Sequence, residues 1–344
     1  MKACPKENRS PNHNSNQRLP RVGITTGDAA GIGPEITLKA VADENIKKIC
    51  RPVLIGDATF LRRAARDLNL QIDFTEVKKG EKIPPDVSSI VIYDLANLKG
   101  AVATGRDAAP TGKASAENIE AAVELWRDGE IEAIATAPIS KKAIQMGGYN
   151  FPGHTEFLAA LTDTKEFAMS FFAGKLRVVL LSIHVSLRDA IKLVKKENLV
   201  RLILFTSREL EKLLGRKVKI AVAGLNPHAS EHGLFGDEEA REINPAIEEC
   251  RAKFGVEVSG AYSPDTIFLR GFRGEFDAVV ACYHDQATIA VKCLSFGASV
   301  NVTLGLPLVR TSVDHGTAFD IAGKNAADAS SMKAAVNLAS TLCR

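Results

Sequence analysis

The segment KLRVVLLSIH (175–184) is a run of branched apolar residues that ends in a polar tip, as buried strands of α/β proteins do. VKIAVAGLNPH (218–228) and FDAVVACYH (276–284) repeat this pattern, and all three segments end in a histidine. In open α/β sheets, ligands collect just beyond the carboxyl ends of the strands. Three neutral imidazoles that meet there would bind a divalent transition metal and leave coordination positions open for a substrate.

Sequence spacing alone does not show that His184, His228 and His284 meet. A single histidine after a strand is more often a turn or core residue, and the three are too far apart to form a local zinc motif such as HExxH. All three follow predicted strands, and Asp285 lies beside the last. This shared context makes a metal site about as well supported as a structural role. His232 is a competing ligand, and we favour His228 because it lies nearer the end of its predicted strand.

The chain from Arg21 onward alternates predicted strands and helices, which favours an α/β fold with a mostly parallel sheet and helices on both faces. Further strands are predicted over 22–26, 51–56, 88–95 and 131–138. Asp57 and Ser115 are predicted to cap the helices that follow them. The helical stretch 188–215 is predicted to break near 195–198.

The length of the chain, 344 residues, exceeds what one hydrophobic core usually supports, so we expect two domains. The first comprises 21–137 and 300–344 and would hold the cofactor. The second, 138–299, would hold the metal and the substrate and form a dimer interface. Residues 1–20 are rich in Asn, Ser, Pro and charge, which predicts a disordered tail.

The charge balance and composition argue against several classes of function. With 44 basic and 41 acidic residues and 6% aromatic residues, the chain has no charge pattern typical of nucleic-acid or membrane binding. It has no apolar run of about 20 residues and no secretory signal. The six cysteines are scattered without a CxxC pair, which fits a reducing, cytoplasmic location.

Two short motifs each have a functional and a structural interpretation. GDAAGIGPEI (27–36) is either a loop that approaches a ligand at a helix N-terminus or a tight turn, and it does not match GxGxxG. GHTE (153–156) precedes an apolar segment, so Thr155 is either a helix cap or, with His154, a donor to an oxyanion. The spacing does not decide between these alternatives.

Polar residues also gather near the third histidine and near the carboxyl terminus. YHDQATIAVK (283–292) places Asp285 and Lys292 near the predicted metal, where Lys292 would bind a phosphate or carboxylate or act as a general acid. The segment 301–328 suggests a site for an anionic ligand, although a solvated loop is the alternative for any one of its polar residues. These residues are Arg310, Thr311, Ser312, Asp314, His315 and Asp320.

Six motifs, in order between about Ile24 and Asp328, resemble the 4-hydroxythreonine-4-phosphate dehydrogenase family of pyridoxine biosynthesis. They are ITTGDAAGIGPEI, GHTE, HVSLRD, GLNPHASE, YHDQ and LGLPLVRTSVDHGTAFDIAG. The last also resembles a segment near the nucleotide in isopropylmalate dehydrogenases. The resemblance implies two α/β/α domains with a cleft, as in isocitrate and isopropylmalate dehydrogenases.

The family resemblance implies a role for each candidate residue. His184, His228 and His284 would bind a divalent metal, typically zinc, with Mg, Co or Mn as alternatives. The phosphorylated substrate would contact His154, Thr155, Lys292, Asn301 and Arg310, and the catalytic groups would be Asp265, Asp285 and Lys292. NAD or NADP would lie against Gly27, Asp28, Gly31, Gly33, His315, Gly316 and Asp320. Family members are homodimers with a shared active site, so both subunits would contribute metal ligands.

The reaction implied by the resemblance is NAD(P)-linked oxidation of the C3 hydroxyl of a 4-phosphorylated four-carbon hydroxy acid, followed by decarboxylation. 4-Hydroxythreonine 4-phosphate is the leading substrate, and D-threonate or D-erythronate 4-phosphate, used by a paralogous branch, is the alternative. The family commonly has Pro at Ala29 and Gly at Ala287, so these departures leave substrate preference open. A metal-dependent sensor without turnover and a metallohydrolase are the hypotheses from other classes.

Overall fold

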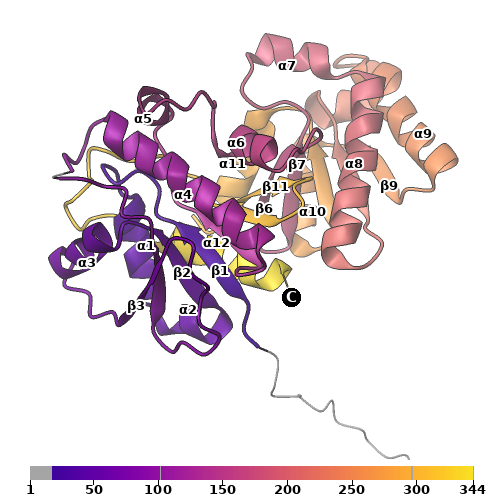
Figure 1. Cartoon of the computed structure of the whole chain (residues 1–344). Helices are drawn as coiled ribbons and strands as arrows, with labels where there is room; N and C mark the ends of the chain where they lie inside the picture. The colour runs from indigo at the N-terminus through magenta and orange to yellow at the C-terminus, as the bar shows by residue number, and fades with distance from the viewer. Residues whose placement is uncertain (1–17, 101, 296, 344) are drawn as a thin grey trace, which may run out of the picture.

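The computed structural model describes residues 18–100, 102–295 and 297–343. Its first part contains β1 (Arg21–Thr25), α1 (Gly33–Val41), α2 (Glu44–Ile49), β2 (Arg51–Gly56), α3 (Ala58–Asp67), β3 (Phe74–Lys78), β4 (Ile90–Asp94), α4 (Ala109–Arg127) and β5 (Ala133–Thr136). The chain then crosses to a second part through α5 (Lys141–Met146) and α6 (His154–Leu161). Figure 1 shows the two parts side by side.

The second part begins with β6 (Ala168–Ala173), β7 (Leu176–Leu180), α7 (Leu187–Leu193), α8 (Lys196–Leu214) and β8 (Ile220–Ala223). It continues through η1 (Pro227–Gly233), η2 (Glu239–Ile243), α9 (Asn244–Phe254), β9 (Val258–Tyr262), α10 (Pro264–Arg273), β10 (Ala278–Ala281) and α11 (His284–Ser295). The chain returns through β11 (Val300–Leu304) and β12 (Val309–Ser312) and ends in α12 (Ser330–Leu342).

In the described part of the chain, all strands join one twelve-stranded sheet in the order β3-β4-β2-β1-β5-β12-β11-β6-β7-β10-β8-β9. The strands from β3 to β12 are parallel to one another, and so are those from β7 to β9. Three successive antiparallel pairings, β12–β11, β11–β6 and β6–β7, separate these sets. The two parallel sets therefore run in opposite directions.

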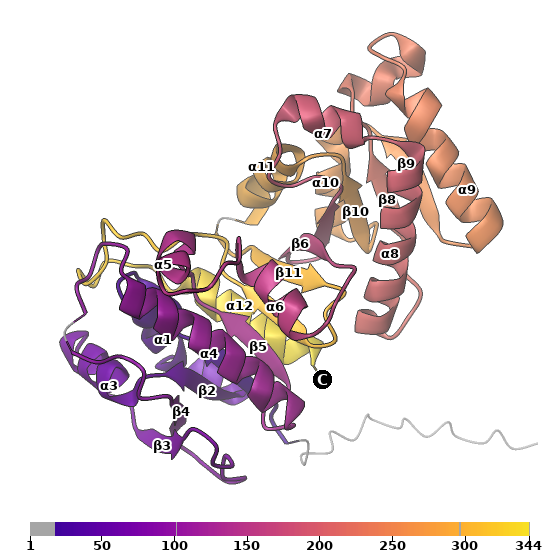
Figure 2. The ribbon, with the colours of Figure 1, turned by 45° about the horizontal axis from the view of Figure 1, so that its top comes forward.

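Helices cover both faces of the sheet and bury one hydrophobic cluster per face in each part. On one face, α1, α2 and α3 cover the first part and α8 and α9 cover the second. The helix α12 belongs to this face and contributes to both clusters, with Met332 and Val336 in one and Ala335 in the other. Figures 1 and 2 show α12 (yellow) beside the central strands, where the two parts meet.

The structure confirms the mixed α/β fold and most of the predicted elements. Asp57 caps α3 by accepting a hydrogen bond from the backbone N–H of Phe60, and the predicted helix break falls between α7 and α8. The prediction that Ser115 caps a helix is wrong. The helix α4 begins at Ala109 with a proline in its first turn, so Ser115 lies inside it and donates to the carbonyl of Gly112.

The proposed division into two domains stays a prediction, because both parts share the single sheet. The predicted boundaries at 137/138 and 299/300 fall just after β5 and at the start of β11. The predicted tail lies largely outside the described residues. None of the described helices is both long enough and apolar enough to cross a lipid bilayer.

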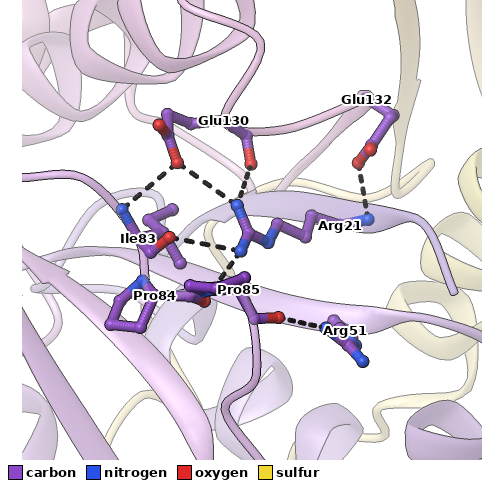
Figure 3. Close-up of polar contacts among 7 residues, drawn as sticks. All are labelled: Arg21, Arg51, Ile83, Pro84, Pro85, Glu130 and Glu132. Atoms are coloured by element: carbon purple, nitrogen blue, oxygen red, sulfur yellow. Dashed lines mark hydrogen bonds and ion pairs between the residues drawn. The ribbon is translucent and has the colours of Figure 1, made fainter. Parts of the chain in front are cut away.

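A buried arginine fixes the start of β1, which lies between β2 and β5 in the sheet (Figure 3). The guanidinium of Arg21 donates to the carboxylate of Glu130 at 3.2 Å and to the carbonyl oxygens of Ile83 and Pro84 at 3.2 and 2.7 Å. The same Glu130 carboxylate accepts the backbone N–H of Ile83 at 3.2 Å. One side chain thus holds together the first strand, the loop before β4 and the loop after α4.

Replacing Arg21 with Met should lower the free energy of unfolding by about 3 kcal/mol, because it leaves three carbonyl oxygens without this donor and removes the cation that is paired with the poorly solvated carboxylate of Glu130. Urea denaturation measures this change. Arg51→Met is the matched control, since the hydrogen bond from Arg51 to the carbonyl of Pro85 lies at the surface. The control should change stability by no more than about 0.5 kcal/mol, and equal effects would contradict the role given to Arg21.

Candidate active site

The three loops that carry the predicted metal ligands leave the same edge of the sheet. β10 lies between β7 and β8 and is parallel to both, so the carboxyl ends of all three strands coincide. His184 follows β7 by four residues, and His284 is the first residue of α11. The ring centroids of His184 and His284 are 6.1 Å apart, so the structure brings these two predicted ligands together.

His228 does not complete a three-ligand group with this pair in the described part of one chain. It belongs to η1, where the five consecutive residues 228–232 have positive φ angles between 44° and 65°. Its ring lies 6.3 Å from that of Phe235. Across the residues that the structure describes, no three His, Cys, Asp or Glu side chains of one chain are grouped as metal ligands. The three-histidine site therefore stays a prediction.

His184 and His284 open into a cavity of about 420 Å³ on the face of the central strands opposite α12. Alternation along β12 explains this position. The hydroxyl of Thr311 donates to the carbonyl of Ala335 in α12, so Arg310 and Ser312 face the other side. The other lining residues are Pro138, Ile139, Lys141, Pro152, Gly153, His154, Thr155, Glu156, Met169, Phe171, Asn301, Val313, Asp314, His315 and Gly316.

Arg310 places a buried positive charge in the floor of the cavity. The residue is 3% exposed, and its guanidinium donates to the hydroxyls of Thr136 at 2.8 Å and Thr303 at 3.0 Å and to the side-chain oxygen of Asn301 at 3.4 Å. These partners are neutral, and its Nε is buried without a hydrogen-bond partner among the described residues. Burial lowers the pKa of Arg310 to about 10, so the side chain remains a cation at neutral pH.

His154, the first residue of α6, presents a second unpaired nitrogen to the cavity. Its Nε2 is buried and has no partner among the described residues. Burial, and then the positive charge of Arg310, lowers the pKa of His154 well below 6.5, so the ring is neutral. The buried hydroxyl of Thr155 lies 3.4 Å from that of Thr303. Unpaired nitrogens around a cation that has no directly bonded carboxylate among the described residues form a site suited to an oxyanion, although the negative charge of Glu156 lies in the same cavity.

This geometry decides between the two interpretations of GHTE. The helix begins at His154, its N-cap is Gly153, and no side chain caps it. Thr155 is therefore not a cap but a buried residue on the first turn, facing the same cavity as Arg310. The structure thus favours the interpretation in which His154 and Thr155 face a ligand.

The two clustered histidines suit a divalent metal in their chemistry. The Nδ1 of His284 lies 2.7 Å from the carboxylate of Asp285, which orients the ring and leaves Nε2 available as a ligand. His184 is exposed at the mouth of the cavity, where its ring is accessible. The pair supplies two of the three or four protein ligands that a zinc site needs.

The predicted catalytic residues do not line this cavity in a single chain. Asp265 and Asp285 line a separate groove of about 560 Å³ between α10 and α11. Lys292 is exposed on α11 and lines neither hollow. Asp285 contacts His284, so its observed role is to orient that ring.

The predicted cofactor residues divide into a buried and an accessible group. Gly27, Asp28, Gly31 and Gly33 are buried. A Cβ on Gly31 would lie 2.8 Å from the carbonyl oxygen of Thr317, and the N–H of Ile32 donates to that same oxygen at 3.0 Å. The buried segment 27–33 therefore packs against the 315–323 loop and holds it in place. His315 and Gly316 line the cavity, and Asp320 is exposed.

Several lining residues have no counterpart among the predicted site residues. Lys141 and Glu156 lie at the cavity, and Met169 and Phe171 of β6 form part of its wall. Lys141 follows a buried strand, as the predicted histidines do, so the same signal applied to IEAIATAPISKK would have identified it. Met169 and Phe171 were not predictable in this way, because nothing in the sequence marks β6 as the neighbour of β11.

The low pKa of His154 predicts a pH dependence of stability. The unfolded chain binds a proton at this residue near pH 6.5 and the folded chain resists doing so, so stability is lost as the pH falls below about 6.5. The free energy of unfolding should therefore be lower at pH 5 than at pH 7, and part of this loss should come from His154. Urea denaturation of the wild type and of His154→Gln at both pH values measures it, and identical pH profiles would contradict it.

Comparison with known proteins gives a consistent assignment. The model of the family described as "Pyridoxal phosphate biosynthetic protein PdxA" matches residues 48–339. The D-threonate 4-phosphate dehydrogenase of Cupriavidus necator is 45% identical over 315 residues, which cover 91% of this chain and 94% of that protein.

Two crystal structures named 4-hydroxythreonine-4-phosphate dehydrogenase share the fold. The one from Klebsiella pneumoniae has a TM-score of 0.85 and 39% identity and covers 94% of this chain and 100% of that one. The one from Burkholderia phymatum has a TM-score of 0.83 and 41% identity and covers 95% and 99%. The protein therefore belongs to the PdxA family and, like these relatives, is a dehydrogenase.

Proposed function

We propose that this protein oxidises the C3 hydroxyl of a 4-phosphorylated four-carbon hydroxy acid with NAD or NADP, and that the 3-oxo product loses its carboxylate. 4-Hydroxythreonine 4-phosphate is the leading candidate substrate, because two solved relatives of 39% and 41% identity are named for it. The observation that carries the proposal is a cavity that combines the unpaired donors of Arg310 and His154 with the paired rings of His184 and His284.

Arg310, His154 and Thr155 would bind the phosphate, with Asn301 beside the guanidinium. Hydrogen bonds from the cationic guanidinium to a phosphate are strong and directional, so they would hold the substrate in one orientation. Fixing the phosphate in this way also limits where the C3 carbon lies in the cavity, and such positioning can contribute several kcal/mol to the rate. Neutral His154 would donate a hydrogen bond without adding charge.

His184 and His284 would hold a divalent metal, which we propose is zinc, with Mg, Co or Mn as alternatives. When bound, the metal would polarise the C3 hydroxyl as a Lewis acid and stabilise the negative charge that develops during decarboxylation. The contact with Asp285 keeps His284 in the orientation and tautomer that a ligand needs. Since His228 does not complete a three-ligand group with this pair in the described residues of one chain, we propose that a second copy contributes to the ligand set.

A nicotinamide cofactor would accept the hydride from C3. His315 and Gly316 lie at the cavity and Asp320 is exposed on the same loop, so these residues would face the cofactor. The buried segment with Gly27, Asp28, Gly31 and Gly33 would contribute by holding this loop in place. We propose no preference between NAD and NADP.

The groove between α10 and α11 supports a homodimer with a shared active site. It combines the exposed apolar residues Ile289, 63% exposed, and Leu269, 40% exposed, with Asp265 and Asp285. A second copy that covered this apolar surface would bring both carboxylates close to an active site. Asp265, Asp285 and Lys292 would then act as catalytic groups at the interface. We also propose a cytoplasmic location, consistent with the scattered cysteines.

D-Threonate 4-phosphate is a second candidate substrate, because the relative with that name is 45% identical over nearly the whole chain. The two compounds share the phosphate and the C3 hydroxyl and differ at C2, which carries an amino group in one and a hydroxyl in the other. Both fit the same assignment of phosphate and metal sites. Only turnover distinguishes them.

Formation of NADH or NADPH by the metal-loaded protein tests the substrate class. The panel is 4-hydroxythreonine 4-phosphate, D-threonate 4-phosphate and D-erythronate 4-phosphate, each with and without a chelator. We expect chelator-sensitive turnover of at least one compound. Binding of these compounds without turnover of any of them would contradict the proposal and favour a sensor.

Replacing Arg310 with Met should lower kcat/KM for the phosphorylated substrate by about 100-fold, because a buried charge-assisted contact is lost. The same change should have little effect on the slow reaction of the dephosphorylated compound, which lacks the contact in both proteins. Steady-state kinetics on the two compounds give this comparison. Equal losses on both would place Arg310 outside the phosphate site.

A further inference from the structure

We infer that Gln286 is a positioning residue that fixes the loops of the predicted metal ligands relative to one another, an inference that rests on the proposed function. Its side-chain Oε1 accepts the backbone N–H of Cys282 at 2.8 Å, and its Nε2 donates to the carbonyl of Gly224 at 2.8 Å. Cys282 directly follows β10 and Gly224 directly follows β8. One amide side chain therefore extends the pairing of these strands beyond their ends.

A carboxamide suits this position because it offers an acceptor and a donor at a fixed separation. Leucine has a similar size but offers neither group, and asparagine is shorter by one methylene. Gln286 lies two residues after His284, and Gly224 lies four residues before His228. The bridge therefore sets the distance between the loops of His284 and His228 within one copy, so in a shared site it fixes where each copy presents its ligands.

Ser182 extends the bridge to the third loop. Its buried hydroxyl donates to the carbonyl of Cys282 at 3.0 Å. Cys282 is thus held at its N–H by Gln286 and at its carbonyl by Ser182. Since Ser182 and Cys282 each precede their histidine by two residues, the loops of His184, His228 and His284 are all tied to one residue.

Glu239 holds the loop of His228 from its other side. It is 2% exposed, and its carboxylate accepts the backbone N–H groups of Leu225 and Asn226, each at 2.8 Å, and the side-chain amide of Asn226 at 2.9 Å. The backbone that leads to His228 is therefore fixed at Gly224 by Gln286 and at the next two residues by Glu239. Little freedom remains before the left-handed turn begins.

These hydrogen bonds lie beyond the ends of the regular strands. Within the strands, backbone pairing and buried side chains already hold the sheet together. Metal binding demands more than folding does, because ligands must be placed to within about 0.5 Å. Loss of groups that orient metal ligands typically weakens metal binding by about 10- to 100-fold. Gln286→Leu and Gln286→Asn should show a loss of this size while the far-UV circular dichroism of the folded protein stays unchanged.

The experiment measures zinc affinity by chelator competition and the visible absorption of the cobalt-loaded protein, both on the full-length chain. The spectrum reports ligand geometry, which a merely structural role would not alter. Gln71→Leu, at an exposed position, is the control and should match the wild type in both readouts. Ser182→Ala removes one hydrogen bond of the same bridge and should weaken zinc binding by about 5-fold, which keeps the inference testable if the Gln286 variants do not fold.

Wild-type affinity and an unchanged cobalt spectrum in the Gln286 variants would overturn the inference and leave the proposed function standing. His284→Ala separates the two cases. If this variant binds zinc as the wild type does, or if the wild type binds none, the proposed metal site itself is wrong. Weaker binding with an altered spectrum in Gln286→Leu or Gln286→Asn supports the inference.

Discussion

The register of β12 against its neighbours is the constraint on which the active site depends. Side chains alternate along a strand. Because Thr311 packs against α12, its neighbours Arg310 and Ser312 point to the opposite face, toward the cavity. Asn301 lies opposite Ser312, and Phe171 lies opposite Asn301, so β11 and β6 present their own polar and apolar groups to the same space. A shift of one residue would bury the cation against α12 and empty the cavity of its donors.

No carboxylate among the described residues forms a direct ion pair with Arg310, although the negative charge of Glu156 in the same cavity favours the cation. Desolvation disfavours the cation, as its lowered pKa shows, and its partners are two hydroxyls and an amide oxygen. A carboxylate in direct contact would stabilise the folded protein more, but it would repel a phosphate. A buried arginine without a directly bonded carboxylate, beside a neutral histidine, is a local loss of stability of the kind found at functional sites.

The sequence was sufficient for features that depend on local patterns. Apolar runs that end in histidine identified β7, β8 and β10, and an aspartate before a periodic segment identified the start of α3. The pairing of β6 with β11 was not predictable, because more than a hundred residues separate these short strands and antiparallel reversal has no local signal. The position of His228 was not predictable either, since it depends on a left-handed turn that contains no glycine before its last residue.

The start of α4 shows a different kind of failure. Pro110 indicates a helix start, but Ser115 and the periodic residues after it led to a predicted start at Ser115, six residues after the observed start at Ala109. The carboxylates Asp265 and Asp285 illustrate the limit set by a single chain. The sequence motifs that contain them imply a place beside the predicted metal ligands. In the fold of one chain they line the groove between α10 and α11 instead.

The continuous sheet has a mechanical consequence. Two lobes joined by a flexible linker can close on a ligand by rotating about a hinge, but here the backbone ladder runs without interruption from β5 through β12, β11 and β6 to β7. The two parts can approach each other only by a change in the twist of these central strands, which are also the strands that form the floor of the cavity. Any closing movement would therefore act directly on the strands that carry Arg310 and Asn301.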